Sequence, residues 1–251
     1  MPFILFLALI SWIAGFLGGL TGTGGIIMPP LLIELYSVPP HLATAMAQAS
    51  YVLPSFLATA LFIRHGQLSW RVALPLAIPG LICTFAAATW LKPRLADSSI
   101  GIIFSACVIV SGLSVLGRAS WRLARPLAPP WRAPILSVLG GLVGLMSGIT
   151  GSGSNAVLVP VMIFFGLELL PILAACQCYA VLASLFGTVG NSMNMAIDPA
   201  AIAAMVATQM SGIWLGVRLA QRLDTSKLKR AIGLVCLLAG LFLLAKELIV
   251  R

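Results

Sequence analysis

The chain alternates between long apolar runs and short polar gaps. A helix needs about 20 apolar residues to cross the hydrocarbon core of a bilayer, and most of the long runs approach or reach that length. They cover residues 3–20, 42–63, 72–91, 99–117, 133–149, 172–193, 199–217 and 231–245. Two shorter runs, 26–36 and 156–167, closely follow glycine-rich stretches, and this length is more typical of re-entrant than of spanning segments. The pattern predicts an all-α polytopic membrane protein.

Composition strengthens the membrane assignment. Hydrophobic residues make up 60% of the 251 residues and charged residues 8%, against roughly 25% charged in soluble domains. This excludes a soluble enzyme, a disordered protein and a disulfide scaffold. The five cysteines lie in apolar runs, where they are expected to be small buried residues. Cys176 and Cys178 lack further ligands at metal spacing, so we predict no metal site and no cofactor. The first residues carry no basic region, and no cleaved signal peptide is expected.

The basic residues indicate the topology. The net charge is +9, but the basic residues lie in gaps between apolar runs, which argues against a nucleic-acid-binding face. Eleven of the 15 Lys and Arg residues fall in the gaps 64–71, 118–132 and 218–230. Because Lys and Arg mark cytoplasmic loops, we predict that all three gaps are cytoplasmic. The stretch 133–167 must then enter and leave on the cytoplasmic face, and 3–36 on the outer face, with both termini outside.

The two halves of the chain match at a constant offset of 129 residues. Eleven positions of the first half recur without a gap in the second half: Gly15, Gly19, Thr21, Gly22, Gly24, Ala45, Gln48, Val52, Leu53, Ser55 and Thr59 match Gly144, Gly148, Thr150, Gly151, Gly153, Ala174, Gln177, Val181, Leu182, Ser184 and Thr188. Later the match needs gaps, since Arg94-Leu95 resembles Arg222-Leu223 and Ile100-Gly101 resembles Ile232-Gly233.

This duplication predicts the domain organisation. Each half is a hairpin with a broken, re-entrant helix, followed by three transmembrane helices. An odd number of crossings inverts the second half, a plan that many secondary transporters use. We predict an N-terminal transmembrane repeat at 1–117, a basic cytoplasmic linker at 118–132 and a C-terminal repeat at 133–251.

The two glycine-rich breaks are the main candidate site. Non-helical backbone in a bilayer must be buried in protein or line water. If a short helix follows each break, its N-terminal N–H groups and its dipole attract an anion, and inverted symmetry brings two such ends together. Before the breaks, Gly15–Gly19 and Gly140–Gly148 are small-xxx-small patterns that favour helix packing. The predicted substrate-binding residues are Thr21, Gly22, Thr23, Gly24, Gly25, Gln48, Thr150, Gly151, Ser152, Gly153, Ser154, Asn155 and Gln177.

Two longer motifs enclose the breaks. The first reads Gly15-Phe-Leu-Gly-Gly-Leu-Thr-Gly-Thr-Gly-Gly, followed by Pro29-Pro-Leu-Leu. The second reads Gly144-Leu-Met-Ser-Gly-Ile-Thr-Gly-Ser-Gly, followed by Pro160. Together they resemble the two signatures of the sulfite exporter TauE/SafE family, also called the TSUP permeases. The resemblance covers essentially the whole chain, although that family often has further glycine where this chain has Ser154-Asn155. It implies a carrier in a bacterial or archaeal inner membrane for sulfite, sulfonates, thiosulfate or other small organic anions.

Further polar residues are weaker candidates. Gln48 and Gln177 are placed either to donate to a sulfonate oxygen or to join helices by hydrogen bonds. Arg64 and Arg71 suit either steering of an anion or snorkelling at the bilayer surface, and His65 is a weak candidate for proton coupling. Steering or gating roles are also considered for Tyr51, Tyr179, Asn191 and Asn194.

The sequence therefore predicts a secondary transporter, and more export than uptake, for a small sulfur-containing oxyanion such as sulfite or an organosulfonate. Uptake of thiosulfate or another small organic anion stays open because of Cys83, Cys176 and Cys178, and so does an anion channel. An intramembrane enzyme is disfavoured because no catalytic constellation lies at membrane depth. The expected partners are the anion and the lipid bilayer. The coupling ion, H⁺ or Na⁺, and a homo-oligomeric state are left open.

Overall fold

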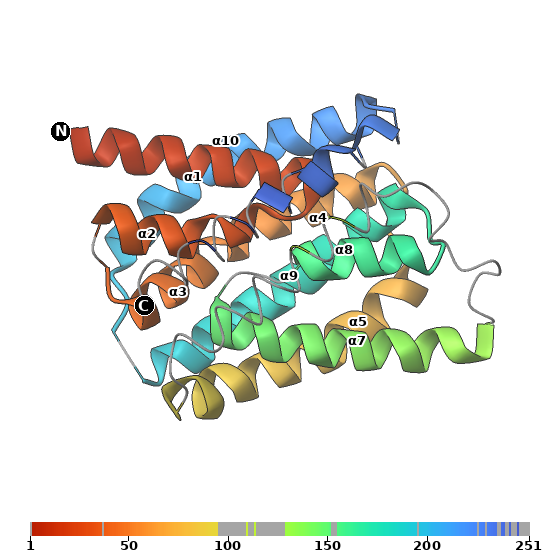
Figure 1. Cartoon of the computed structure of the whole chain (residues 1–251), viewed down its shortest axis with the longest axis horizontal. Coiled ribbons are helices and arrows are strands. Elements are labelled where there is room, and N and C mark those ends of the chain that lie inside the picture. Colours follow the sequence, from red (N-terminus) through yellow and green to blue (C-terminus); the bar gives the residue numbers. More distant parts are fainter. Residues whose placement is uncertain are drawn as a thin grey trace.

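The computed structural model of the chain describes residues 2–36, 38–94, 109, 113, 129–151, 155–194, 196–224, 226–228, 230–234, 237–238, 241 and 245. Its elements are helices, as predicted (Figure 1). They are α1 (Pro2–Thr21), the 3₁₀ turn η1 (Gly24–Ile26), α2 (Met28–Tyr36), α3 (Pro40–Ser50), α4 (Val52–Arg64), α5 (Trp70–Ala86), the π-helix η2 (Ala87–Leu91), the 3₁₀ turn η3 (Lys92–Arg94), α7 (Pro129–Thr150), α8 (Asn155–Phe164), α9 (Leu169–Ser192) and α10 (Pro199–Arg222).

Five helical stretches among the described residues are long and apolar enough to cross a membrane. They are Pro40–Arg64, Trp70–Arg94, Arg132–Thr150, Leu169–Ser192 and Pro199–Arg222. These stretches confirm five of the predicted runs, and α1 adds a shorter apolar helix. The predicted runs 99–117 and 231–245 lie mostly outside the described residues, as does most of the linker 118–132. The protein is a multi-pass membrane protein.

One predicted helix is divided. The run 42–63 forms α3 and α4, which meet at Tyr51. Pro54 has no N–H to donate to the carbonyl of Ser50, so the regular α-helical ladder cannot continue there. The N–H of Tyr51 bonds instead to the carbonyl of Gln48 at 3.2 Å, a tighter turn than an α-helix makes. A second difference concerns α7, which begins at Pro129 inside the predicted linker, because proline is well accepted in the first turn of a helix.

The helices pack in an order that is unchanged when the two halves are exchanged. The order of contacts is α1, α10, α4, α9, α5 and α7. Figure 1 shows α1 beside α10 along one side of the molecule and α5 beside α7 along the other, with α9 between them. The hairpin helix of each half therefore packs on the second spanning helix of the other half. Neither half forms a separate body.

Glycines allow this close packing. A Cβ atom on Gly15 or Gly19 would collide with the backbone of α10, at Gln209 and Ile213. In the second half, a Cβ atom on Gly144 would collide with the backbone of Gly80 in α5. Gly140 and Gly148 meet the backbone of α5 in the same way. The packing role predicted for these glycines is confirmed.

The outer surface of the bundle is apolar, as lipid contact requires. On α5 the exposed side chains Leu74, Ile78 and Ile82 recur every four residues and so lie on one face. The opposite face of α5 carries the buried Ala73, Leu76 and Ala77 toward α7. Large apolar side chains thus point outward while small ones face the neighbouring helix.

The end of α5 contains one additional residue. The π-helix η2 holds a wider turn, which amounts to one inserted residue in an α-helix. Before it, Gly80 and Thr84 correspond to Gln209 and Ile213 at the offset of 129; after it, Arg94 matches Arg222 at 128. The gap that the repeat needs at this point therefore coincides with the π-helix. Residues after the insertion are rotated by about 100° around the helix axis.

Candidate functional site

Each hairpin helix ends in the same way at its glycine-rich break. Gly22 follows α1 with a φ of 76°, and Gly151 follows α7 with a φ of 66°. This left-handed conformation suits glycine, which often terminates helices by adopting it. The N–H of Gly22 bonds to the carbonyl of Gly18, and that of Gly151 to the carbonyl of Ser147, both at 2.9 Å. The two breaks therefore share one backbone geometry.

The helices after the breaks begin where the sequence predicts short segments. In the first half the 3₁₀ turn η1 begins at Gly24 and α2 follows at Met28; in the second half α8 begins at Asn155. Among the described residues, no carbonyl accepts from the N–H groups of Gly24 and Gly25. Such orphan donors at a helix start suit an anion. The predicted residues Ser152, Gly153 and Ser154 lie outside the described residues.

The threonines of the breaks bond within their own half. The hydroxyl of Thr21 donates to the carbonyl of Leu17 at 2.8 Å and lies 2.5 Å from the hydroxyl of Thr23. The N–H of Thr23 also reaches the Thr21 hydroxyl, at 3.3 Å. Thr150 donates to the carbonyl of Met146 at 2.7 Å, the equivalent of the Thr21 bond. These hydroxyls hold the breaks in shape, so in this conformation the donors left toward a ligand in the first break are backbone N–H groups.

Two glutamines join the halves at the breaks. The side-chain amide of Gln177 donates to the carbonyl of Gly18 at 2.7 Å, and that of Gln48 donates to the carbonyl of Ser147 at 3.4 Å. Each accepting carbonyl is the one that also receives the N–H of the break glycine. Gln48 and Gln177 correspond at the offset of 129, and so do Gly18 and Ser147. The interhelical hydrogen bonds foreseen for these glutamines are confirmed; contact with a substrate stays a prediction.

The two breaks approach each other. A Cβ atom on Gly22 would lie 3.9 Å from the Cβ atom of Asn155, at the start of α8. Gly151 in turn packs against the backbone of Thr44 in α3. Asn155 is buried, and its side-chain oxygen has no hydrogen-bond partner among the described residues. The end of the first hairpin helix and the start of the second short helix therefore enclose one region of the protein.

Tyr51 and Tyr179 are buried supports near these breaks. The hydroxyl of Tyr51 donates to the carbonyl of Ala14 at 2.9 Å, and Gly24 packs against the same hydroxyl. Tyr179 packs its ring against Gly80. Its hydroxyl is buried without a hydrogen-bond partner among the described residues. Both side chains fix helix packing around the site, while the gating role predicted for them is not tested.

A polar chain that sequence reasoning missed leads away from the second break. The ammonium of Lys92, whose side chain is 4% exposed, donates to the side-chain oxygen of Asn191 at 2.8 Å. The side-chain N–H of Asn191 donates to the oxygen of Gln48 at 2.9 Å. Lys92 also donates to the carbonyl of His41 at 3.1 Å. Lys92, Asn191 and Gln48 thus form a continuous hydrogen-bonded chain that ends at Ser147.

The remaining candidates lie near the ends of the bundle. Asn194 is exposed and donates to the carbonyl of Thr89 at 3.2 Å, which fits the alternative of a cap at the end of α9. Arg64, His65 and Arg71 are exposed where α4 ends and α5 begins. In Figure 1 this end also holds the start of α7 and the end of α10. The described parts of the three basic gaps therefore share one end of the molecule.

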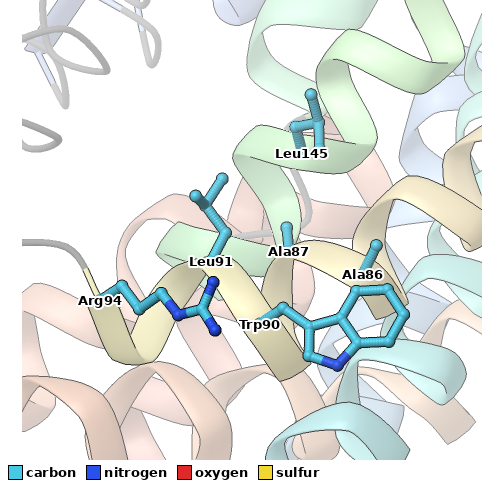
Figure 2. A pocket seen from close by; sticks show the side chains of 6 residues that line it. All are labelled: Ala86, Ala87, Trp90, Leu91, Arg94 and Leu145. Carbon is cyan, nitrogen blue, oxygen red and sulfur yellow. The ribbon is translucent and has the colours of Figure 1, made fainter.

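A shallow cavity lies away from the breaks, where the π-helix and α7 diverge (Figure 2). It has a volume of about 240 Å³. The side chains that line it are Ala86, Ala87, Trp90, Leu91, Arg94 and Leu145. Arg94 is its charged member, and Figure 2 shows its side chain at the opening near Leu91 and Trp90. None of the predicted substrate-binding residues lines this cavity.

Comparison with known proteins agrees with this architecture. The chain is 25% identical to the probable membrane transporter protein YdhB of Bacillus subtilis over 250 residues, which cover 97% of this chain and all of that protein. It is 32% identical to the probable membrane transporter protein y4hK of Sinorhizobium fredii over 119 residues, about half of each chain (47%). No solved structure matches the chain significantly. The family described as Sulfite exporter TauE/SafE matches residues 7–243. The chain therefore belongs to the TauE/SafE family of membrane transporters.

Proposed function

We propose that the protein is a secondary transporter that exports a small sulfur-containing oxyanion, sulfite or an organosulfonate, bound between the two glycine-rich breaks. The observation that carries the proposal is the matched pair of breaks. Gly22 and Gly151 end their helices with the same backbone conformation, and Gln177 and Gln48 hold them by equivalent bonds. Family membership supports anion transport, and the geometry supports a site built from both halves.

The chemistry of the breaks suits an anion. A small oxyanion needs several hydrogen-bond donors and little space. The N–H groups at Gly24 and Gly25 supply donors from the first break, and the start of α8 directs a partial positive charge at the same region. The hydroxyls of Thr21 and Thr23 bond to each other and to backbone, which keeps these N–H groups in place. We infer that backbone donors, with Asn155 nearby, bind the oxyanion.

The packing order supports an alternating-access mechanism. The pairs α1–α10 and α5–α7 each combine one hairpin helix with a spanning helix of the other half. Each pair is held tightly by glycines, so it moves as a rigid unit, while α4 and α9 lie between the pairs. Rocking of one pair against the other opens the region between the breaks first to one side and then to the other.

The orientation is part of the proposal. In Figure 1 the open ends of the α1–α2 hairpin lie at one end of the bundle, and those of the α7–α8 hairpin lie at the other. The basic gap 64–71 and the end of α10 lie at the latter end. By the positive-inside rule we assign this end to the cytoplasm of a bacterial or archaeal cell, with the N-terminus outside.

Thiosulfate transport by way of thiols gains less support from the structure. Cys176 is buried in the hydrophobic core, and the sulfur of Cys83 packs against Gly141. These positions are typical of cysteines that fill space. Thiosulfate therefore enters the test below as one anion among several.

The test is ligand-dependent thermal stabilisation of the purified protein in detergent, with sulfite, sulfate, thiosulfate, sulfoacetate, taurine and acetate. A ligand that binds the folded state raises the melting temperature. We expect stabilisation by sulfite or a sulfonate, and loss of that stabilisation in Thr21→Val and Thr150→Val.

Thr208→Val is the matched control for these variants. Thr208 bonds to the carbonyl of Ala204 within α10, so it loses the same kind of intrahelical bond without touching a break. Stabilisation by acetate alone, or stabilisation that survives both break substitutions, would refute the proposed site. If sulfite and the sulfonates leave the melting temperature unchanged, the proposed substrate is wrong.

A further inference from the structure

Lys92 is a buried cation that the proposed substrate site does not yet use. It lies two residues before the end of the membrane-spanning stretch Trp70–Arg94, and 4% of its surface is exposed. Burying an ammonium costs several kcal/mol even after the surroundings relax. Ionisable residues buried in membrane-spanning bundles therefore commonly mark ion or substrate pathways.

The surrounding backbone brings Lys92 into the bundle. Lys92 directly follows the π-helix η2, whose additional residue turns the next side chains by about 100°. Gly190 then allows α9 to approach, since a Cβ atom there would crowd the hydroxyl of Thr89 at 2.8 Å. Asn191, the next residue on α9, meets the ammonium as a result. Insertions of this type occur frequently at functional sites.

The contacts of Lys92 fix the direction of a hydrogen-bond chain. An ammonium can only donate, so Asn191 must present its oxygen to Lys92 and its N–H group to the oxygen of Gln48. Gln48 must then turn its own N–H group toward the carbonyl of Ser147, which lies at the second break. The charge on Lys92 thereby determines how the break is held.

We propose that the ammonium of Lys92 is a second anion-binding group of the transport path, which binds the oxyanion between the break site and the outer end of the bundle. The anion takes the place of the Asn191 oxygen or the His41 carbonyl, because a charged acceptor forms the stronger hydrogen bond with an ammonium. Once Asn191 loses this donor, its hold on Gln48 is no longer fixed. Arrival of the anion at Lys92 thus loosens the second break. This inference rests on the proposed function.

The experiment measures binding of sulfite and sulfoacetate to full-length Lys92→Met, Lys92→Arg and Asn191→Asp in detergent. Lys92→Met keeps the shape but removes the charge, and we expect the dissociation constant to rise at least about 30-fold. Lys92→Arg keeps a donor cation and should remain within about tenfold of the original protein. Asn191→Asp places a carboxylate against Lys92, which competes with the ligand; binding should fall although the unliganded protein melts no lower than before.

Lys227→Met is the matched control, because Lys227 lies on the surface 3.7 Å from Asp224 and both side chains are largely exposed. If Lys92→Met and Asn191→Asp bind sulfite as tightly as the original protein does, the inference about Lys92 is wrong and the proposed function stands. If the original protein binds neither anion, both are wrong. Should Lys92→Met fail to fold, Asn191→Asp decides alone, since a purely structural role for Lys92 would leave its anion binding intact.

Discussion

The two breaks share a frame but differ in what lies behind it. At the first break the oxygen of Gln177 is buried and has no hydrogen-bond partner among the described residues. At the second, the equivalent oxygen of Gln48 accepts from Asn191, which is bonded to Lys92. The position that corresponds to Asn191 in the first half is Phe62, a fully buried core residue. Duplication thus supplies matched helices and turns, whereas the polar chain with its charge was built on one side.

This difference has a physical meaning for a carrier. Two equivalent states of a rocking bundle need similar frames, and the matched glycines and glutamines provide them. A single buried charge on one side of the frame makes the two states unequal for an anion. The asymmetry therefore lies in the electrostatics of the path, while the backbone stays close to symmetric.

The largest expected effect comes from breaking the frame itself. Gly144→Ala and its equivalent Gly15→Ala would force Cβ atoms into the backbones of α5 and α10, respectively. Overpacking commonly costs about 1–3 kcal/mol, and here the colliding atoms are backbone that cannot yield easily. We expect both variants to lower the melting temperature by at least about 5 °C, or to abolish folding, to a similar extent.

Gly141→Ala is the control for the frame variants. Its Cβ atom would meet the sulfur of Cys83 at 3.4 Å, an ordinary contact, and alanine favours the helix by about 1 kcal/mol. The melting temperature should therefore stay unchanged or rise. An equal loss of stability in Gly141→Ala and Gly144→Ala would show that close packing of α7 on α5 does not limit stability.

The glutamines should separate the two halves. Gln177→Leu removes one bond to the carbonyl of Gly18, which keeps its bond from Gly22. Gln48→Leu removes the bond to Ser147 and also leaves the N–H group of Asn191 without its acceptor. A buried unpaired polar group costs about 1–3 kcal/mol, so Gln48→Leu should lower the melting temperature several degrees more than Gln177→Leu does. Equal losses in thermal unfolding would contradict the asymmetry.

The smallest effect is expected at a pair of threonines within helices. Thr59 bonds to the carbonyl of Ser55 at 2.8 Å, and Thr188 bonds to that of Ser184 at 2.6 Å, the equivalent position. Both bonds are local and neither joins the halves. Thr59→Val and Thr188→Val should each change the melting temperature by no more than about 3 °C and leave anion binding within about twofold. A marked difference between them would mean that the asymmetry extends beyond the polar chain.

Much of the frame could be predicted from the sequence because its causes are local. Apolar length defines spanning helices, and the turn at Gly22 requires the residue type that the sequence supplies there. The break at Tyr51 was missed although Pro54 signals it, because the apolar run continues through both residues. In each case the information lies within one turn of the feature.

Lys92 could not be found in this way. In the sequence it follows Trp90-Leu91 and precedes Pro93-Arg94, a setting typical of a basic residue at the bilayer surface. Its burial depends on the additional residue of the π-helix and on contact with Asn191, which is 99 positions away along the chain. A pattern read over one helix contains neither fact.

The packing of α1 on α10 also determines when the protein can be completed during synthesis. α1 is the first helix to leave the ribosome, and its partner begins only at Pro199. Until then the glycine face of α1 has no backbone to pack against, and Gln177, which holds the end of α1, has only just been made. The first hairpin must therefore wait in the membrane, loosely held, until more than three quarters of the chain has been inserted. Final closure of the bundle is a late, post-insertion event that a truncated chain cannot reach.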